Sequence, residues 1–192
     1  MLIPRKVHLI LTGASGYLGQ HLLSDWIQNG LKDIGDSQFQ ITALYHKSET
    51  FPKALKAFRE KNPCHPTISE VVVSSLDLTN PSESDIDSLL QPQSLTILVH
   101  AAALSSPRVC QANPETARAL NVPTKFLDAL LQKVSASIVA LSTDQVYDGK
   151  QISGSCYKED EKEGLQPVNV YGQTKLELEA YISSKPQNQS RV

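Results

Sequence analysis

The sequence predicts an α/β fold built on a doubly wound parallel sheet of about five strands. Short runs rich in β-branched residues alternate with longer amphipathic stretches, which is the pattern of consecutive β-α-β units. At 192 residues, the chain has the length of one ordinary domain with its own core. The expected strands are residues 7–11, 40–45, 71–74, 96–99 and 137–141.

Amphipathic stretches predict the helices between these strands. Residues 17–29 carry Leu18, Leu22 and Trp26 at fourfold spacing, which indicates a core-facing stripe, and the glycine that follows is placed to end the helix. Residues 48–69 contain a lysine-rich helical segment, and we interpret them as an insertion between the second and third strands.

A later helix is expected to bend. Asn113 followed by Pro114 is typical of a helix start. Pro123 lies inside this helix, where a proline removes a hydrogen-bond donor and crowds the carbonyl four residues earlier. We therefore predict a kink near residues 119–123.

The C-terminal part is expected to hold the last helix, over about residues 170–184 and ended by Pro186. We predict a single domain over residues 1–185 and a frayed polar tail over residues 186–192. Only two strands are recognisable in the second half of the sheet, so the fifth strand would present an unpaired edge unless another chain or the last helix covers it.

Composition narrows the class of protein. The formal net charge of -2 gives no electrostatic reason to expect nucleic acid as a partner. No apolar run has the length of a membrane span or of a signal-peptide core, so we expect a cytoplasmic protein without a membrane partner. Cys64, Cys110 and Cys156 lack the spacing of a zinc site, and we expect free thiols and no metal.

A glycine loop follows the first strand and opens a helix. Gly13, Gly16 and Gly19 have the spacing G-x-x-G-x-x-G, in which backbone N–H groups and the positive helix end approach a pyrophosphate. The alternative is a tight structural turn. On the first interpretation, the loop contributes these candidate cofactor-binding residues: Gly13, Ser15, Gly16, Tyr17, Leu18 and Gly19.

The end of the second strand bears on which dinucleotide binds. An Asp or Glu there would bond the ribose 2′-hydroxyl of NAD, but the residues are Tyr45, His46 and Lys47. With no carboxylate and a cation available, the 2′-phosphate of NADP is better accommodated, and NAD is the less favoured cofactor. The alternative is that Lys47 is simply solvated.

The fourth strand ends in small residues. Ala101 and Ala102 follow His100, and small side chains are expected where the backbone lies near a cofactor, although close packing alone also explains alanines. We expect His100 to be a strand-end residue rather than a base.

Two Tyr-x-x-x-Lys pairs occur near the C-terminus, Tyr171 with Lys175 and Tyr181 with Lys185. This spacing puts the phenol and the ammonium on one helix face, where the lysine charge would lower the tyrosine pKa for proton transfer. Tyr171 begins its helix, which would place it at the ligand-binding end of the sheet. We therefore assign Tyr171 and Lys175 to catalysis and to cofactor contact.

Thr143 completes the predicted catalytic group. The fifth strand finishes at Leu141, so Ser142, Thr143 and Asp144 lie outside the carboxyl end of a parallel strand, where doubly wound sheets bind ligands. Thr143 is placed to hold a substrate carbonyl, and Tyr171 to donate a proton to it. For Ser142 and Asp144, turn capping is an equal alternative.

At these residues the chain resembles the extended short-chain dehydrogenases/reductases, and within them the dTDP-4-dehydrorhamnose reductase family. The most specific stretches are Ser142-Thr143-Asp144-Gln145-Val146-Tyr147-Asp148-Gly149 and Tyr171-Gly172-Gln173-Thr174-Lys175-Leu176. The other matching stretches are residues 12–19, 98–103, 113–121 and 157–177.

This resemblance implies a Rossmann domain in which Thr143, Tyr171 and Lys175 take part in the NADP(H)-dependent reduction of a 4-keto group on a nucleotide-linked deoxysugar. It also implies that Asp77 or its neighbour Leu76 lies near the adenine. Asn121 is implied to help hold a proton-relay water. Gln145 stands where family members commonly have an aromatic residue, and Pro123 is unusual.

The same family includes the regulatory β subunit of methionine adenosyltransferase, which implies a second function: a non-catalytic NADP-binding partner of a methionine adenosyltransferase catalytic subunit. A homo-oligomer is a further possible assembly. A full fold of the family continues beyond the Tyr/Lys helix. We therefore expect that this chain is C-terminally truncated and lacks the C-terminal substrate-binding region, which puts turnover by the chain itself in question.

Overall fold

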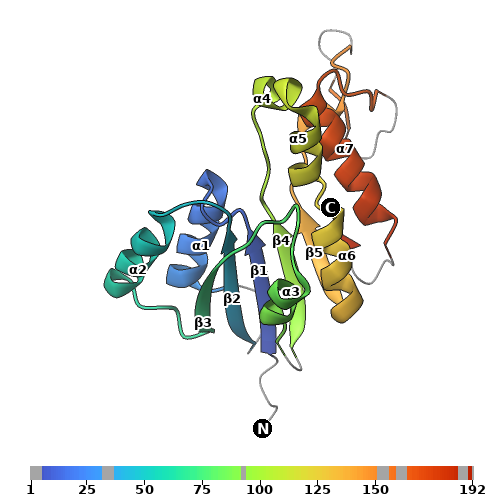
Figure 1. Ribbon diagram of the computed structural model, residues 1–192. Coiled ribbons are helices and arrows are strands. Elements are labelled where there is room, and N and C mark those ends of the chain that lie inside the picture. The colour runs from blue at the N-terminus through green and yellow to red at the C-terminus, as the bar shows by residue number, and fades with distance from the viewer. Residues whose placement is uncertain are drawn as a thin grey trace.

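The computed structural model describes residues 6–31, 37–91, 94–150, 156–158, 164–185 and 190–191. Its strands form one parallel sheet in the order β3-β2-β1-β4-β5-β6 (Figure 1). This confirms the predicted doubly wound fold and its five strands. The strands are β1 Lys6–Thr12, β2 Gln38–Tyr45, β3 Ile68–Ser75, β4 Leu95–His100, β5 Ala136–Ala140 and the short β6 Ser190–Arg191.

Each face of the sheet carries its own hydrophobic core, because neighbouring residues of a strand point to opposite faces. In β1, Leu9 and Leu11 belong to one core, whereas Ile10 belongs to the other. The central strand is therefore buried on both sides, which explains its continuous run of apolar residues.

Helices cover both faces of the sheet (Figure 1). The core on the first face includes residues of α1 Tyr17–Asn29 and α2 Phe51–Lys61. The core on the second face includes residues of α3 Glu83–Leu89, α6 Thr124–Lys133 and α7 Val170–Ser183. Beyond the carboxyl ends of the strands lie α4 Pro107–Ala112 and α5 Pro114–Asn121, beside the start of α7, and the short 3-10 helix η1 Asp144–Val146 follows β5.

The buried face of α1 differs from the predicted stripe. Its buried residues are Gly19, Leu23 and Ile27, whereas Leu18 is 43% exposed. Gly19 packs against the backbone of the glycine loop, and this contact sets the rotation of the helix about its axis. The core-facing residues are therefore displaced by one position from those that the spacing of large apolar residues indicated.

Two further predictions are corrected. The lysine-rich segment is not an insertion: it is α2, the crossover between β2 and β3, and it buries Phe51 and Leu55. The predicted kink is a break, because α5 ends at Asn121 and Pro123 is the N-cap of α6. A proline has no N–H to continue the hydrogen-bond ladder, and the chain starts a new helix.

The outer edge of β5 is partly covered by the chain itself. Ile138 and Val139 pair with Ser190 and Arg191 of β6, a strand that the sequence did not predict. Residues 186–189 and 192, the rest of the predicted frayed tail, lie outside the described residues.

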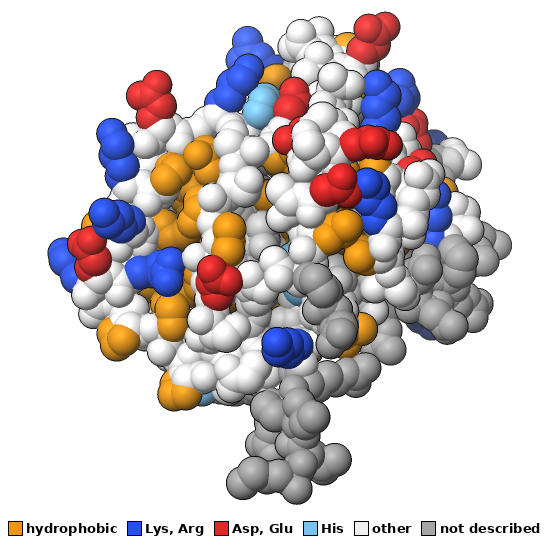
Figure 2. Space-filling model, turned by 60° about the horizontal axis from the view of Figure 1, so that its bottom comes forward, with side chains coloured by type: hydrophobic (Ala, Val, Ile, Leu, Met, Phe, Trp, Pro, Cys, Tyr) orange, Lys and Arg blue, Asp and Glu red, His pale blue; other side chains and the backbone are white. Residues whose placement is uncertain are grey.

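Charges are interspersed on the surface. Figure 2 shows Lys and Arg side chains alternating with Asp and Glu side chains, with hydrophobic side chains visible between them. Within the described part of the chain, no helix combines the length and the apolar character of a membrane span, and no cluster of three or more His, Cys, Asp or Glu side chains could hold a metal ion.

Candidate functional site

The glycine loop between β1 and α1 is shaped by close approach of backbone to backbone. Gly13 has a φ of 70°, and a Cβ there would come within 2.7 Å of the Ala102 nitrogen. A Cβ at Gly19 would collide with the Gly13 carbonyl oxygen. Packing alone therefore requires both glycines, whereas Gly16 is exposed and a Cβ there would lie 3.2 Å from the Gly13 oxygen.

The start of α1 is open at this loop. Its N-cap, Gly16, makes no side-chain capping bond, and its first turn contains no acidic residue. The N–H groups of a first helical turn have no partner within the helix and carry partial positive charge. Tyr17 and Leu18 contribute such N–H groups, while the Tyr17 side chain is 83% exposed and lies edge-on to His21. This arrangement suits a pyrophosphate.

A groove of about 220 Å³ runs from the loop across the carboxyl ends of the central strands. Its position is the one at which doubly wound sheets bind ligands, where crossovers leave the sheet in opposite directions. The candidate residues Gly13, Ser15, Gly16, His46, Ala101 and Ala102 all line it, and the remaining lining residues are Leu44, Tyr45, Leu76, Leu78, Ala103 and Leu120.

A buried hydrogen-bond chain joins the ends of β1 and β4 beneath the groove. The Thr12 hydroxyl lies 2.9 Å from His100 Nδ1 and accepts a hydrogen bond from the Ala102 N–H at 3.2 Å. Burial, followed by the charge of Lys175, lowers the pKa of His100 to about 3, so the imidazole is neutral at physiological pH. These contacts agree with the prediction of a strand-end residue.

The end of β2 lies beside the carboxylate of Asp77, which follows β3 in the chain. The β2–β3 pairing brings Asp77 to His46, whose Nε2 lies 3.8 Å from a carboxylate oxygen. The Thr79 hydroxyl and N–H donate to Asp77, and together with His46 and Lys47 they lower its pKa, so it is ionised. The sequence near His46 and Lys47 does not show this carboxylate. It lies beside them because β3 is the neighbour of β2 in the sheet.

Thr143 and Tyr171 meet beyond the carboxyl end of β5. The Thr143 hydroxyl donates to Asp144 at 3.1 Å and accepts from the Gln145 N–H at 3.3 Å, which makes it the N-cap of η1. Tyr171 is the second residue of α7, whose N-cap Asn169 accepts from the Gly172 N–H at 2.9 Å. The Asn169 amide also donates to Gln145 Oε1 at 2.9 Å, so the departure from the family pattern at Gln145 ties η1 to the start of α7.

The pKa of Tyr171 is displaced in the direction opposite to the prediction. Burial raises it, the neighbouring Cys110 and Asp144 raise it further, and only the hydrogen bond with Thr143 lowers it. Lys175 is not among the groups that shift this pKa, and its ammonium donates to the Leu141 carbonyl at 2.7 Å. Tyr171 is therefore a neutral phenol at physiological pH, which is the form of a proton donor.

Lys175 is almost completely buried, with 2% of its surface exposed. Burial lowers its pKa, and Glu179 one turn further along α7 opposes this shift. Glu179 also accepts a hydrogen bond from Ser142. The sequence interpretation missed Glu179, although its spacing of four from Lys175 on one helix was a usable signal.

Asn121, the last residue of α5, joins that helix to α7. Its Nδ2 donates to Thr174 at 2.9 Å, and the Thr174 hydroxyl donates to the Tyr171 carbonyl at 2.8 Å. The same amide forms two hydrogen bonds with the backbone of Leu104: its oxygen accepts from the N–H at 2.7 Å, and its nitrogen donates to the carbonyl at 3.2 Å. Both ends of the side chain are thus bonded to protein, and the implied role of holding a relay water stays a prediction.

The second pair, Tyr181 and Lys185, has different surroundings. Lys185 Nζ lies 4.1 Å from the Tyr181 ring centre, and both side chains donate to Asp128 of α6, at 2.5 Å from the tyrosine and 2.6 Å from the lysine. Their hydrogen bonds join the end of α7 to α6. Neither residue belongs to the groove or to the group at Thr143.

The parallel sheet, with helices on both faces, defines the class of protein by its fold: a doubly wound Rossmann fold, which solved nucleotide-sugar epimerases share. The structure is similar to the UDP-Glc/GlcNAc 4-epimerase from Campylobacter jejuni, with a TM-score of 0.68 and 21% identity over 92% of this chain and 48% of that chain. The UDP-glucose 4-epimerase of Thermus thermophilus gives a TM-score of 0.66 and 21% identity over 95% of this chain and 51% of that chain.

Within this class, the chain belongs to the family described as RmlD substrate binding domain, which matches residues 7–191. This confirms the resemblance to the dTDP-4-dehydrorhamnose reductase family.

Curated relatives of different kinds match this chain. The methionine adenosyltransferase 2 subunit beta of Xenopus laevis is 33% identical over 101 residues, 52% of this chain and 29% of the relative, and that of Bos taurus is 26% identical over 181 residues, 94% of this chain and 43% of the relative. The dTDP-4-dehydrorhamnose reductase of Aggregatibacter actinomycetemcomitans is 28% identical over 177 residues, 91% of this chain and 46% of the relative. This chain spans less than half the length of each of them.

Proposed function

We propose that this chain binds NADP(H) as part of a reductase of the dTDP-4-dehydrorhamnose reductase type, which reduces a 4-keto group on a nucleotide-linked deoxysugar. The observation that carries the proposal is the meeting of Thr143 and Tyr171 at the end of β5, with buried Lys175 on the same helix face as Tyr171. Strand β5 is adjacent to β4, whose end lines the groove.

The residues divide the chemistry between them. A bound nicotinamide supplies the hydride. The Thr143 hydroxyl holds the substrate carbonyl, and the neutral phenol of Tyr171 donates the proton that the new alkoxide needs. Lys175 places a positive charge near the end of β5, where negative charge develops.

Preference for NADP over NAD is part of the same proposal. His46 lines the groove and Lys47 is the next residue in the chain, which supports a role for the lysine charge in attracting a 2′-phosphate. Asp77 acts in the other direction, because a carboxylate repels that phosphate and can accept from a ribose hydroxyl. The proposal requires the charge of Lys47, with the hydrogen-bonding imidazole of His46 beside it, to outweigh this single carboxylate.

A binding titration and a turnover assay test the proposal. The purified chain is expected to bind NADPH more tightly than NADH, and Lys47→Ala with His46→Ala is expected to remove the preference. NADPH oxidation is expected only when a dTDP-4-keto-6-deoxysugar is added, with the 192-residue chain compared with a version extended to the length of its relatives. Failure to bind either dinucleotide would refute the proposal.

A second function is favoured by the relatives named methionine adenosyltransferase 2 subunit beta. In this alternative the chain binds NADPH without turnover and associates with a methionine adenosyltransferase catalytic subunit. Co-purification of the two proteins, with no NADPH oxidation in the presence of the sugar nucleotide, would favour it over the reductase. For either function we propose the cytoplasm as the location, since Cys64, Cys110 and Cys156 are free thiols and suit a reducing compartment.

A further inference from the structure

Helix α7 forms hydrogen bonds with two consecutive residues that follow β5. Lys175 Nζ donates to the Leu141 carbonyl at 2.7 Å, and the Ser142 hydroxyl donates to Glu179. The next residue is Thr143, which meets Tyr171. The two contacts therefore fix the strand end immediately before the hydroxyl that we assign to substrate binding.

The surroundings of Lys175 show what Glu179 does electrostatically. An ammonium with only 2% of its surface exposed loses hydration, and burial lowers its pKa. His100 of β4, which the lysine charge affects, is neutral and cannot compensate. On α7 itself, Tyr171 is a neutral phenol, and Glu179 is the group that favours the charged lysine.

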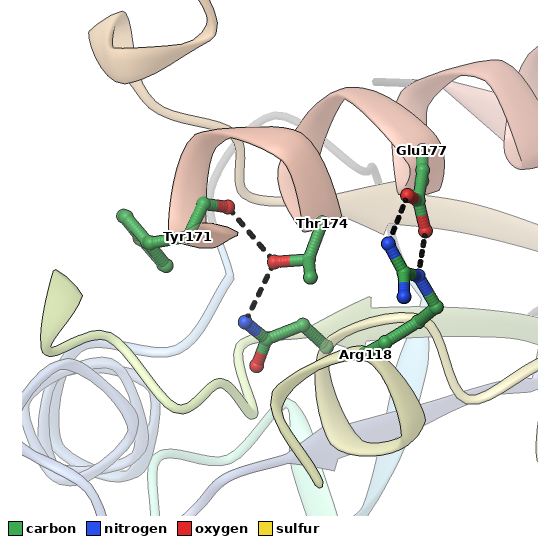
Figure 3. Close-up of polar contacts among 5 residues, drawn as sticks. Arg118, Tyr171, Thr174 and Glu177 are labelled. Carbon is green, nitrogen blue, oxygen red and sulfur yellow. Dashed lines mark hydrogen bonds and ion pairs between the residues drawn. The ribbon is translucent and has the colours of Figure 1, made fainter. Parts of the chain in front are cut away.

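The neighbouring carboxylate provides a contrast. Glu177 lies on the same helix but forms two hydrogen bonds with Arg118 of α5, at 2.8 and 2.9 Å (Figure 3). Glu179 instead contacts the strand end. A glutamate placed four residues after a lysine is also the less favourable order for stabilising an isolated helix, which indicates that this position serves another purpose.

We propose that Glu179 is a positioning residue, which holds Ser142 so that Thr143 stays opposite Tyr171 and places a carboxylate one helical turn from the buried ammonium of Lys175. The catalytic consequence rests on the reductase function proposed above, whereas the effect on Lys175 does not. The two can therefore be measured separately.

The experiment uses the ligand-free chain with labelled lysine side chains, in which NMR follows the titration of Lys175 after its signal has been assigned with Lys175→Met. Glu179→Gln keeps a hydrogen-bond acceptor for Ser142 but removes the charge. Ser142→Ala keeps the charge but removes the hydrogen bond. Glu177→Gln removes a carboxylate from the same helix and is the matched control.

Glu179→Gln is expected to move the Lys175 titration to lower pH, while Ser142→Ala and Glu177→Gln leave it in place. Glu179→Asp retains the charge at a shorter reach and is expected to give a smaller displacement, which keeps the test available if the glutamine variant does not fold. If Lys175 titrates at the same pH in the Glu179 variants as in the Glu177 control, the proposal is wrong.

Turnover supplies the second measurement. With NADPH and the keto-sugar nucleotide, Ser142→Ala is expected to lower kcat by roughly tenfold through displacement of Thr143, with little change in NADPH affinity. Unchanged kcat in this variant would refute the positioning of Thr143. Absence of turnover in the unaltered chain would refute the reductase proposal, while the Lys175 titration would still decide the electrostatic part.

Discussion

Two Tyr-x-x-x-Lys pairs are alike in sequence but have different partners: Tyr171 and Lys175 lie on helix α7, whereas Tyr181 lies near its end and Lys185 just beyond it. Tyr171 lies in the first turn and packs with Cys110 and Leu104, while its partner Lys175 is buried beside the end of β5. At the other end, Tyr181 and Lys185 bind one carboxylate of α6, and the lysine stacks on the tyrosine ring. The same spacing thus gives a candidate proton donor at one end of the helix and a helix-to-helix contact at the other.

The difference comes from what each helix end faces. Because α7 follows the parallel strand β5, its start lies at the carboxyl edge of the sheet, which is the edge where doubly wound folds bind ligands. Its later turns cross the sheet and pack on the core, with Leu178 and Ile182 buried. The second pair therefore meets another helix instead of a ligand, and its polar groups bond to that helix.

The largest effect is expected from removing each phenol oxygen in turn. Tyr171→Phe removes the proton donor and is expected to lower turnover by about 10²–10⁴-fold, the usual contribution of general acid catalysis. Tyr181→Phe is the matched control and is expected to leave turnover unchanged. Steady-state NADPH oxidation with the keto-sugar nucleotide measures both, and circular dichroism checks the fold. Equal losses in the two variants would remove the functional distinction between the pairs.

The second largest effect is expected from replacing the lysine of each pair. Lys175→Met removes the ammonium that we assign to cofactor contact, and because a hydrogen bond to a charged group contributes about 1.5–3 kcal/mol, we expect NADPH affinity to fall by roughly tenfold or more. Lys185→Met removes a contact to Asp128 and is expected to change stability but not affinity. Fluorescence titration with NADPH compares the two. Loss of affinity only in the Lys185 variant would contradict the assignment.

Much of this contrast could be predicted from the sequence. The strand pattern indicated the sheet, and the place of Tyr171 at its helix start selected the correct pair for the carboxyl edge of the sheet. The partners could not be predicted: Asp128 lies 53 residues before Tyr181 in the chain, and Asp77 reaches His46 only because β3 is beside β2. Such contacts depend on strand order and on packing rather than on local spacing.

The buried face of α1 and the pKa of Tyr171 could not be predicted from residue spacing, because both depend on packing. The face of α1 was predicted from its large apolar residues, but contact of the smallest residue, Gly19, with the loop sets the helix rotation. The pKa of Tyr171 was expected to fall because a lysine lies one turn away. Burial raises it instead, and the ammonium of that lysine donates to a carbonyl at the end of β5.

A pH dependence separates the second pair from the first. Burial raises the pKa of Asp128, but hydrogen bonds from Lys185 and Tyr181 lower it further than burial raises it. A carboxyl with a lowered pKa in the folded state stabilises the protein above its unfolded pKa, and the contribution disappears as the pH falls through the folded value. Asp128→Asn is therefore expected to cost about 1 kcal/mol near neutral pH, an amount limited by solvent exposure of the carboxylate.

Urea unfolding at several pH values measures this cost. The difference between Asp128→Asn and the unaltered protein is expected to shrink as the pH falls below about 4, the region in which carboxyls protonate. Lys185 sets the limit at high pH. Its pKa is raised in the folded state, so its contribution to stability disappears as the pH rises through that raised pKa. A difference that does not vary with pH would show that the cluster does not act through charge.

The smallest effect concerns the part of α7 between the two pairs. Arg118 and Glu177 form a bidentate ion pair between α5 and α7, with exposed side-chain fractions of 51% and 42%. Water screens such pairs, so a double-mutant cycle with Arg118→Met and Glu177→Gln is expected to give a coupling of about 0.5 kcal/mol. Because the pair contacts neither the groove nor Asp128, turnover should be preserved in both single variants. A coupling energy of zero would leave the buried bond from Asn121 to Thr174 as the polar contact that holds the catalytic helix to α5.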